Sequence, residues 1–280
     1  MNKIALFILF VTTFSFGAKA QMEEYQYVQT GEFGITAGAA HYFGDLNNRA
    51  SINRPKIALG GFFRRQFGNY ISVRLSGHFA QLGYSDIYSK NEFQKSRNLS
   101  FNTNIFELAL MGDFNFFKFV PTDPSRSFTP YASLGVGFMS YDPYAYYNNE
   151  KVYLRPLNTE GQTSYQGRKA YGTTALVVPV GFGVKYAITS KINLSFELSY
   201  RFTTTDYLDD VSTTYIGIDK FPAAEGKSLA GIMQDRSYEL GPRIGIEGRQ
   251  RGFSKQKDQY AMAEVGISFN LTSYQCPSAR

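Results

Sequence analysis

The feature that most constrains this chain is an alternation of apolar and polar residues with a period of two. The clearest segment is 191–203, and segment 261–271 repeats its pattern. Successive side chains of a β-strand point to opposite faces, so each segment predicts a strand with one apolar and one polar face. The apolar positions of these two segments are Ile192, Leu194, Phe196, Leu198, Tyr200 and Phe202, and Ala261, Ala263, Val265, Ile267, Phe269 and Leu271.

Six further segments carry the same alternation with varying clarity. An even number of strands, each about ten residues or longer, is typical of transmembrane β-barrels, whose strands cross the bilayer at a tilt. The alternation therefore predicts eight strands in all. The six segments are 33–43, 57–63, 71–79, 106–116, 132–138 and 176–186.

The polar faces of these strands carry charges of both signs. A soluble β-sandwich or a lipocalin-like barrel would turn the apolar face inward and use strands of about five to six residues. Mixed charges instead suit a narrow barrel interior, where Glu and Arg can pair across the lumen. We therefore predict an all-β fold, an eight-stranded antiparallel transmembrane β-barrel. Its predicted lumen charges are Arg74, Glu107, Asp113, Lys185, Glu197, Arg201 and Glu264.

The connections between the predicted strands alternate between long and short. Outer-membrane barrels combine short periplasmic turns with longer outer loops, so we expect both termini in the periplasm and the long loops outside. Aromatic residues cluster near the strand ends, among them Tyr42, Phe116, Phe117, Tyr141 and Tyr146, where girdles at the membrane boundary are expected. The long connections are 44–54, 85–98, 142–172 and 205–259, and the short ones are 68–69, 121–127 and 189–190.

The first twenty residues have the pattern of a signal peptide. Lys3 precedes an apolar stretch over 4–16, and Ala18-Lys19-Ala20 forms a cleavage site of the A-x-A type. An N-terminal anchor that stays attached is the alternative. We predict a signal peptide over 1–20, a single outer-membrane barrel domain over 21–280, and location in the cell outer membrane.

Composition argues against several kinds of site. The chain has one Cys and two His, too few for a disulfide scaffold and a poor supply of zinc ligands. Its formal charge of +6 is spread along the chain and favours nucleic acid no more than acidic lipid head groups. We therefore expect no metal, no cofactor and no nucleic acid partner, and we expect membrane lipid around the barrel.

The two histidines, His41 and His78, are the candidates for a catalytic base. Ser76 and His78 share one strand face, with Cα atoms about 7 Å apart, which is loose for a nucleophile and its base. A lumen histidine with hydrogen-bonded neighbours is the preferred interpretation, and no catalytic residue is predicted. The alternative is a lipid-modifying barrel enzyme that uses His78 or His41 with a carboxylate from a loop.

Segment 205–215 is the most unusual stretch of the chain. Its carboxylates Asp206, Asp209 and Asp210 could chelate calcium. Turn or helix-start chemistry, with carboxylates accepting backbone N–H groups, is the preferred interpretation. The loop that continues to residue 259 is predicted to be mobile, with binding of an outer partner as the alternative. Cys276 is expected to be a free thiol.

Segments 33–47 and 205–215 together resemble the PorG-like family of outer-membrane barrels associated with type IX secretion. The resemblance implies a non-enzymatic accessory or anchoring component that contacts the periplasmic ring of a lipoprotein and its partner subunit, while a larger protein forms the pore. A structural or small-solute barrel is the alternative. The family-like positions are Gly44, Asp45, Leu46, Asn47, Thr205, Asp206, Tyr207, Leu208, Asp209, Asp210 and Val211.

Overall fold

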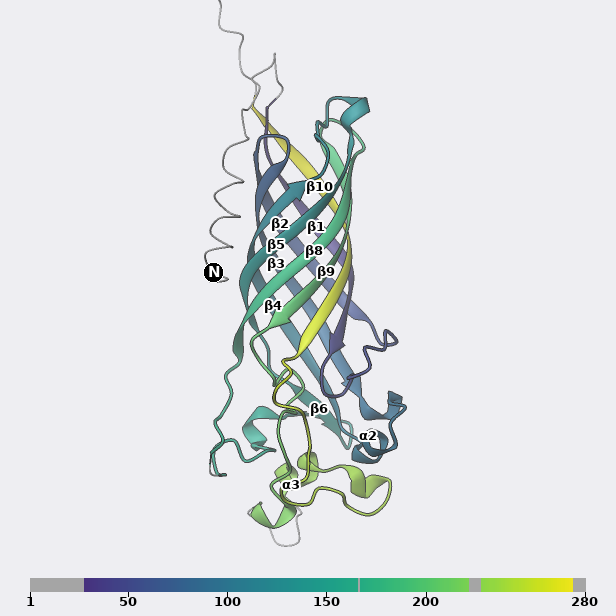
Figure 1. Cartoon of the computed structure of the whole chain (residues 1–280), viewed down its shortest axis with the longest axis vertical. Coiled ribbons are helices and arrows are strands. Elements are labelled where there is room, and N and C mark those ends of the chain that lie inside the picture. The colour runs from purple at the N-terminus through teal and green to yellow at the C-terminus, as the bar shows by residue number, and fades with distance from the viewer. Residues whose placement is uncertain (1–27, 166, 222–227, 274–280) are drawn as a thin grey trace, which may run out of the picture. The chain divides into compact units, whose positions relative to one another are not determined.

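The computed structural model describes residues 28–165, 167–221 and 228–273. Within them the chain forms ten strands and a few short helices (Figure 1). The strands are β1 (Val28–Phe43), β2 (Lys56–Phe67), β3 (Ile71–Ser85), β4 (Ser100–Asn115), β5 (Phe128–Ser140), β6 (Tyr144–Tyr147), β7 (Glu150–Tyr153), β8 (Thr174–Ala187), β9 (Ile192–Thr203) and β10 (Gln259–Ser273). The α-helices are α2 (Glu92–Arg97) and α3 (Leu229–Gln234), and the 3-10 helices are η2 (Asp86–Tyr88), η3 (Pro124–Arg126), η4 (Arg155–Leu157), η5 (Ile218–Lys220) and η7 (Ser237–Glu239).

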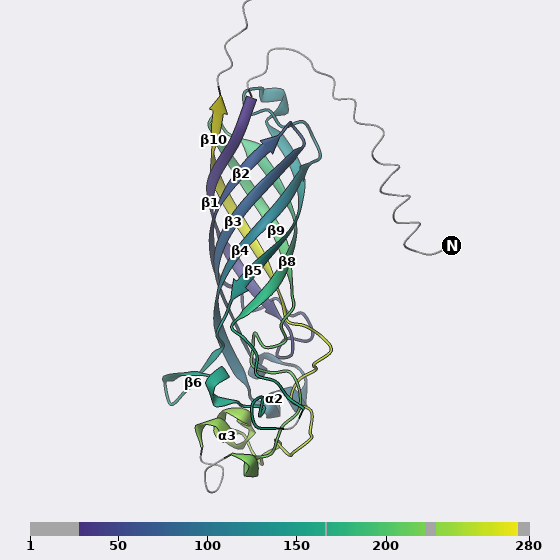
Figure 2. The same ribbon diagram turned by 90° about the vertical axis from the view of Figure 1, so that its left-hand side faces the viewer.

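Eight of the strands close into an antiparallel barrel. The order runs β1, β2, β3, β4, β5, β8, β9 and β10, and β10 pairs back with β1. The barrel strands are 12 to 16 residues long and tilt around the barrel axis (Figures 1 and 2). The eight predicted strands and their antiparallel closure are confirmed.

The outer face of the barrel is apolar, and the inner face is polar. Phe106, Phe138 and Phe182 point outward and are 60%, 62% and 65% exposed. Their neighbours on the opposite strand face, such as Glu107 and Met139, are buried. A closed barrel with an apolar outer belt satisfies its backbone hydrogen bonds internally and suits a bilayer. The chain is an outer-membrane β-barrel, and the soluble alternatives are wrong because their apolar face would point inward.

The two ends of the barrel differ in their connections. Short turns join β2 to β3, β4 to β5 and β8 to β9 at one end, which we call the turn end. The long connections lie at the other end, the loop end, and hold α2 and α3 (Figure 1). Gly68 in the first turn has a φ of +80°, a conformation that glycine adopts without steric cost.

Two sequence expectations about strand ends need correction. Tyr42 and Tyr141 are 1% and 4% exposed, so they pack inside the loop end and take no part in a girdle at the membrane boundary. Phe116, Phe117 and Tyr146 are exposed as expected. In addition, β3 and β4 pair well beyond the predicted segments, as far as Ser85 opposite Ser100.

The β6–β7 hairpin lies within the connection that was expected to be a plain loop. Its turn residues Asn148 and Asn149 have φ values of 49° and 64°, as a two-residue turn between antiparallel strands requires. The alternating tyrosines before this Asn-Asn pair were a signal that could have predicted the hairpin. Only the Asn102–Tyr144 pair joins β6 to the barrel strand β4.

The connection from β9 to β10 packs as a cap over the loop end. Leu208, Val211 and Tyr215 are at most 1% exposed and Leu208 and Val211 share one apolar cluster with Met233 of α3. The expectation of a mobile loop is wrong for these residues, because each buries its side chain. Among the residues that the structure describes, no helix is long and apolar enough to cross a membrane. The predicted signal peptide and Cys276 lie outside the described residues.

Candidate functional site

The first charged cluster fills the lumen near the turn end. Arg64 pairs with Glu32 and with Asp113, at 2.6 Å from the latter. Arg74 lies 3.3 Å from Asp113 and 2.8 Å from Glu197. These side chains come from five strands and are at most about a tenth exposed. The cluster therefore ties opposite walls of the barrel together. Lys185 joins it at 4.0 Å from Glu32.

A second charged cluster lies further toward the loop end. His78 is 3.6 Å from Glu107 and 3.5 Å from Glu264. Arg201 contacts the same two carboxylates, at 3.5 and 4.0 Å. Tyr260 adds a hydrogen bond to Glu107. Glu107 and Glu264 thus each face Arg201 and His78 from other strands. Ion pairs therefore cross the lumen here as well as near the turn end.

The seven predicted lumen charges are all buried within these two clusters. The lumen groups predicted from the sequence did not include Glu32, Arg64, Tyr131 or Asn193. Asn193 donates to Glu32 over 2.7 Å, and Tyr131 donates to Glu197 over 2.8 Å. The polar positions of the alternation continue to Glu32 and Arg64, one residue beyond the predicted segments 33–43 and 57–63, so this signal was available.

The Ser76–His78 pair does not form a nucleophile and its base. The Ser76 hydroxyl donates to the Ala109 carbonyl over 3.4 Å, and the His78 ring faces two carboxylates. His41 contacts the Ser51 carbonyl and the Asn47 amide. Ser76, His78 and His41 thus have contacts other than those of a nucleophile and its base.

The two family-like segments meet at the loop end of the barrel. Leu46 and Leu208 are buried in the same apolar cluster. Asp45 accepts the Phe253 N–H, which follows the cap residue Gly252 in the chain. A Cβ on Gly252 would lie 2.4 Å from the Asp45 carboxylate, so this close approach requires glycine. The resemblance thus concerns one place in the fold, which we call the motif junction.

The centre of the motif junction is a tyrosine between two carboxyl groups. The Tyr42 hydroxyl lies 2.6 Å from Asp209 Oδ2 and 2.9 Å from Asp258 Oδ1. A phenol has one hydrogen to donate, so one carboxyl group must be protonated to complete both hydrogen bonds. A Cβ on Gly44 would lie 2.0 Å from Asp258 Oδ1, which explains glycine at this position.

The carboxyl groups of the motif junction hold protons more tightly than free aspartates. Burial is the largest cause, and it raises the pKa of Asp209 and Asp258 well above the ordinary value, with their mutual repulsion adding to the rise at Asp209. Burial also raises the pKa of Asp206 to about 7 and that of Asp45 to about 6. Asp206 and Asp45 therefore titrate close to physiological pH, and Asp209 and Asp258 hold their protons to a higher pH than free aspartates do.

The remaining polar residues of segment 205–211 bind the cap to itself and to the barrel. Asp210 receives hydrogen bonds from Tyr171 over 2.5 Å and from Thr159, and Arg251 lies 3.8 Å away. Asp206 accepts the Ser212 hydroxyl over 2.5 Å. The Thr205 hydroxyl is 2.6 Å from that of Tyr141 on the barrel side.

The acidic segment accepts backbone N–H groups only in part, and it starts no helix. Asp209 accepts the Val211 N–H over 2.9 Å, as turn chemistry predicts, while its second oxygen contacts Tyr42. Tyr207 stacks on Tyr171 with ring centroids 4.3 Å apart. Among the described residues, no group of three or more His, Cys, Asp and Glu side chains is arranged to hold a metal ion. The alternative of a calcium site therefore has no support in this part of the chain.

Comparison with known proteins assigns a family. The model of a family described as a domain of unknown function (DUF6089) matches residues 6–215. The chain belongs to this family. The match covers the first family-like segment, both charged clusters apart from Tyr260 and Glu264, and the acidic segment. No curated protein sequence matches this DUF6089 member.

Solved structures similar to this DUF6089 member are surface and outer-membrane proteins. Neisserial surface protein A is 9% identical, with 86% of this chain and 97% of that chain covered and a TM-score of 0.44. Ail of Yersinia pestis is 9% identical, with 86% and 99% covered and a TM-score of 0.38. OprG of Pseudomonas aeruginosa is 11% identical, with 89% and 100% covered and a TM-score of 0.36.

Proposed function

We propose that this chain is a non-enzymatic, non-conducting outer-membrane barrel that anchors a folded cap at the cell surface. The observation that carries the proposal is the pair of charged clusters across the lumen. Arg64 and Arg201 are at most 1% exposed, although both lie inside the barrel. Eight-stranded barrels are just narrow enough for side chains to fill the interior. In this barrel, ion pairs hold the side chains that fill the interior in place.

Breaking such a lumen open would be costly. Separating Arg64 from Glu32 and Asp113 would leave buried charges without partners, which costs several kcal/mol. A small polar solute would have to displace both clusters in turn. The packed lumen therefore supports a structural or binding role better than the passage of small solutes.

Conductance in planar lipid bilayers tests this proposal. Purified, refolded protein is expected to give no ohmic current above the bare bilayer, while a general porin inserted under the same conditions gives discrete steps. Folding is checked by the change in gel mobility on boiling. Open-channel steps from the folded wild-type barrel would overturn the proposal and favour solute passage.

A more specific function is an accessory or anchoring role in type IX protein secretion. The observation that favours it is the meeting of the two PorG-like segments, through Leu46 and Leu208, at one motif junction. In this proposal the short turns face the periplasm, where Lys118 and Arg126 could contact acidic groups of the lipoprotein ring or its partner subunit. The barrel then holds the machinery at the membrane without forming the pore.

Gene deletion tests the secretion role. Secreted proteins are quantified in the medium and in the periplasm of the deletion strain and of the strain with the gene restored. Retention of cargo in the periplasm, with export recovered on restoration, is the expected result. Unchanged export would overturn the secretion role and leave the structural barrel standing.

A further inference from the structure

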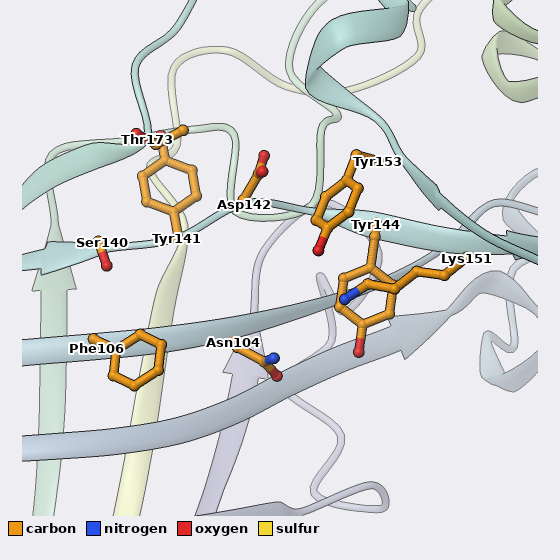
Figure 3. Close-up of a pocket in the computed structure, with 9 residues that line it drawn as sticks. All are labelled: Asn104, Phe106, Ser140, Tyr141, Asp142, Tyr144, Lys151, Tyr153 and Thr173. Atoms are coloured by element: carbon orange, nitrogen blue, oxygen red, sulfur yellow. The ribbon is translucent and has the colours of Figure 1, made fainter.

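The β6–β7 hairpin leaves a cavity against the outer wall of the barrel. The hairpin touches β4 in register only at Asn102 and Tyr144. Beside this point lies a cavity of about 370 Å³ that is open to the surroundings. Figure 3 shows the side chains that line it, with Phe106 at one end and Lys151 at the other. The cavity is outside the lumen, since Phe106 and Ser140 point outward from their strands.

The barrel side of the cavity continues the apolar belt. Phe106 is 60% exposed, and its ring lies 5.1 Å from that of Phe79 on the neighbouring strand. Leu108 and Phe138, further along the same surface, are also exposed. An acyl chain that lies against this belt would therefore lead directly into the cavity. The polar part of such a lipid would then meet the hairpin.

The hairpin side of the cavity offers a cation over two aromatic rings. The Lys151 ammonium lies 3.9 Å from the ring centroid of Tyr144 and 4.7 Å from that of Tyr153. Cation–π contact of this kind orients the ammonium while leaving its other donors free. Lysine is a common partner of phosphate groups. The exposed Tyr153 ring also gives a flat surface on which a sugar ring can stack.

Two acceptor oxygens in the cavity lack a hydrogen-bond donor. They are Oδ1 of Asn104 and Oδ1 of Asp142, and both atoms are buried, although the Asp142 side chain as a whole is 40% exposed. Arg155 lies 3.6 Å from the Asp142 oxygen, which is an ion pair beyond hydrogen-bond distance. Buried acceptors cost free energy until a donor reaches them. A ligand with hydroxyl or amide donors would satisfy them, whereas a bare phosphate head group adds mainly further acceptors.

We propose that this cavity binds the phosphorylated sugar head group of an outer-leaflet glycolipid. The sugar hydroxyls donate to Asn104 and Asp142, the phosphate pairs with Lys151, and the acyl chains follow the belt from Phe106. The combination of donors, negative charge and acyl chains distinguishes this ligand from a phospholipid without head-group hydroxyls, such as phosphatidic acid. The site depends on the barrel standing in the outer membrane, and it is independent of any secretion role.

Native mass spectrometry of the full chain in a neutral detergent tests the proposal. The probe is bis-phosphorylated lipid A, compared with dephosphorylated lipid A and with phosphatidic acid, whose head group has a phosphate and no hydroxyl on a sugar or glycerol. One lipid A molecule is expected to stay bound, and removal of its phosphates is expected to weaken binding about tenfold. Phosphatidic acid held as tightly as lipid A would overturn the proposal, because charge and acyl chains without sugar hydroxyls would then explain binding.

Two variants locate the site on the protein. Lys151→Ala should weaken binding of bis-phosphorylated lipid A about tenfold, and Lys90→Ala, which changes an exposed lysine in another loop of the same end, should leave it unchanged. Tyr153→Ala should weaken binding of both forms of lipid A. Wild-type binding by Lys151→Ala, in protein whose gel mobility shows a folded barrel, would contradict the proposed site.

Discussion

The lumen and the motif junction both bury carboxyl groups, and they stabilise them in different ways. In the lumen, Glu32 and Asp113 face the guanidinium of Arg64. At the motif junction, Asp209 and Asp258 face each other across the Tyr42 hydroxyl. A buried guanidinium keeps its positive charge at every accessible pH. A tyrosine brings only one hydrogen, so the second hydrogen bond depends on a proton from the solvent.

The contacts that hold the barrel therefore do not depend on pH, whereas the contacts that hold the cap do. Ion pairs across the lumen hold the barrel walls together without protons from the solvent. The cap is held at Tyr42 by a hydrogen-bond arrangement that is complete only when a carboxyl group is protonated. The cap can therefore loosen while the barrel that carries it remains intact.

The largest effect is expected from removing an arginine of the ion pairs that cross the lumen. Arg64→Ala leaves Glu32 and Asp113 as buried carboxylates that have lost their shared cation, and should lower the free energy of unfolding by about 3–5 kcal/mol. Urea titration of the folded gel band measures this loss. Arg65→Ala is the matched control, since the neighbouring side chain is exposed on the outer face. Equal stability of the two variants would show that the lumen ion pairs do not hold the barrel.

A smaller and local effect is expected at the motif junction. Tyr42→Phe removes the hydroxyl between Asp209 and Asp258. Buried carboxyl oxygens then lose a hydrogen-bond partner, which should destabilise the cap by about 1–3 kcal/mol. The loss should appear as faster proteolytic cleavage within residues 205–258, with the barrel band on gels unchanged. Tyr186→Phe, a change on the exposed outer face, should cleave like wild type. Destabilisation of the whole barrel by Tyr42→Phe would contradict a separately held cap.

The smallest effect is expected from Asp209→Asn. The amide stands in for the protonated carboxyl group, because its oxygen can accept the Val211 N–H and its NH2 can donate to the Tyr42 hydroxyl, which then donates to Asp258. The variant should therefore resist cleavage of the cap better than wild type at pH 8 and differ from it by less than about 1 kcal/mol at pH 5. Asp123→Asn, in an exposed turn at the other end, is the control. A variant whose cap weakens equally at both pH values would show that Asp209 acts through its shape alone.

The barrel could be predicted from the sequence because its signal is local. Alternation in segments such as 191–203 specifies both the strand and the face that turns outward, and charges such as Arg201 and Glu264 mark the lumen. The exposed belt also explains why the alternation is so regular, since a lipid-facing position tolerates few polar residues. The extra length of β3 and β4 was not predicted, because residues 80–85 and 100–105 turn apolar side chains such as Leu82 and Phe101 inward and so do not follow the pattern of apolar outward positions.

The motif junction could not be predicted, because its contacts are distant in the sequence. Tyr42 and Asp209 are 167 residues apart, and Arg251 pairs with Glu160 across 91 residues. Nothing in the segment around Asp209 alone shows that a tyrosine from the first strand will reach it. The carboxylates therefore looked like an exposed turn or a calcium loop. Burial, which raises their pKa, exists only once the cap has folded.

The most direct test is hydrogen exchange of the whole chain at pH 5 and pH 8, corrected for intrinsic rates. The closed cap keeps protons on Asp209 and Asp258 that an opened cap releases, because burial raises their pKa. Its stability is therefore full below about pH 4 and falls as pH rises through the raised pKa values, including about 7 for Asp206. We expect faster exchange at pH 8 in residues 205–215 and 251–258, with the barrel strands equally protected at both pH values. Equal protection of the cap at pH 5 and pH 8, or loss of protection throughout the strands, would contradict the contrast between a charge-locked barrel and a proton-dependent cap.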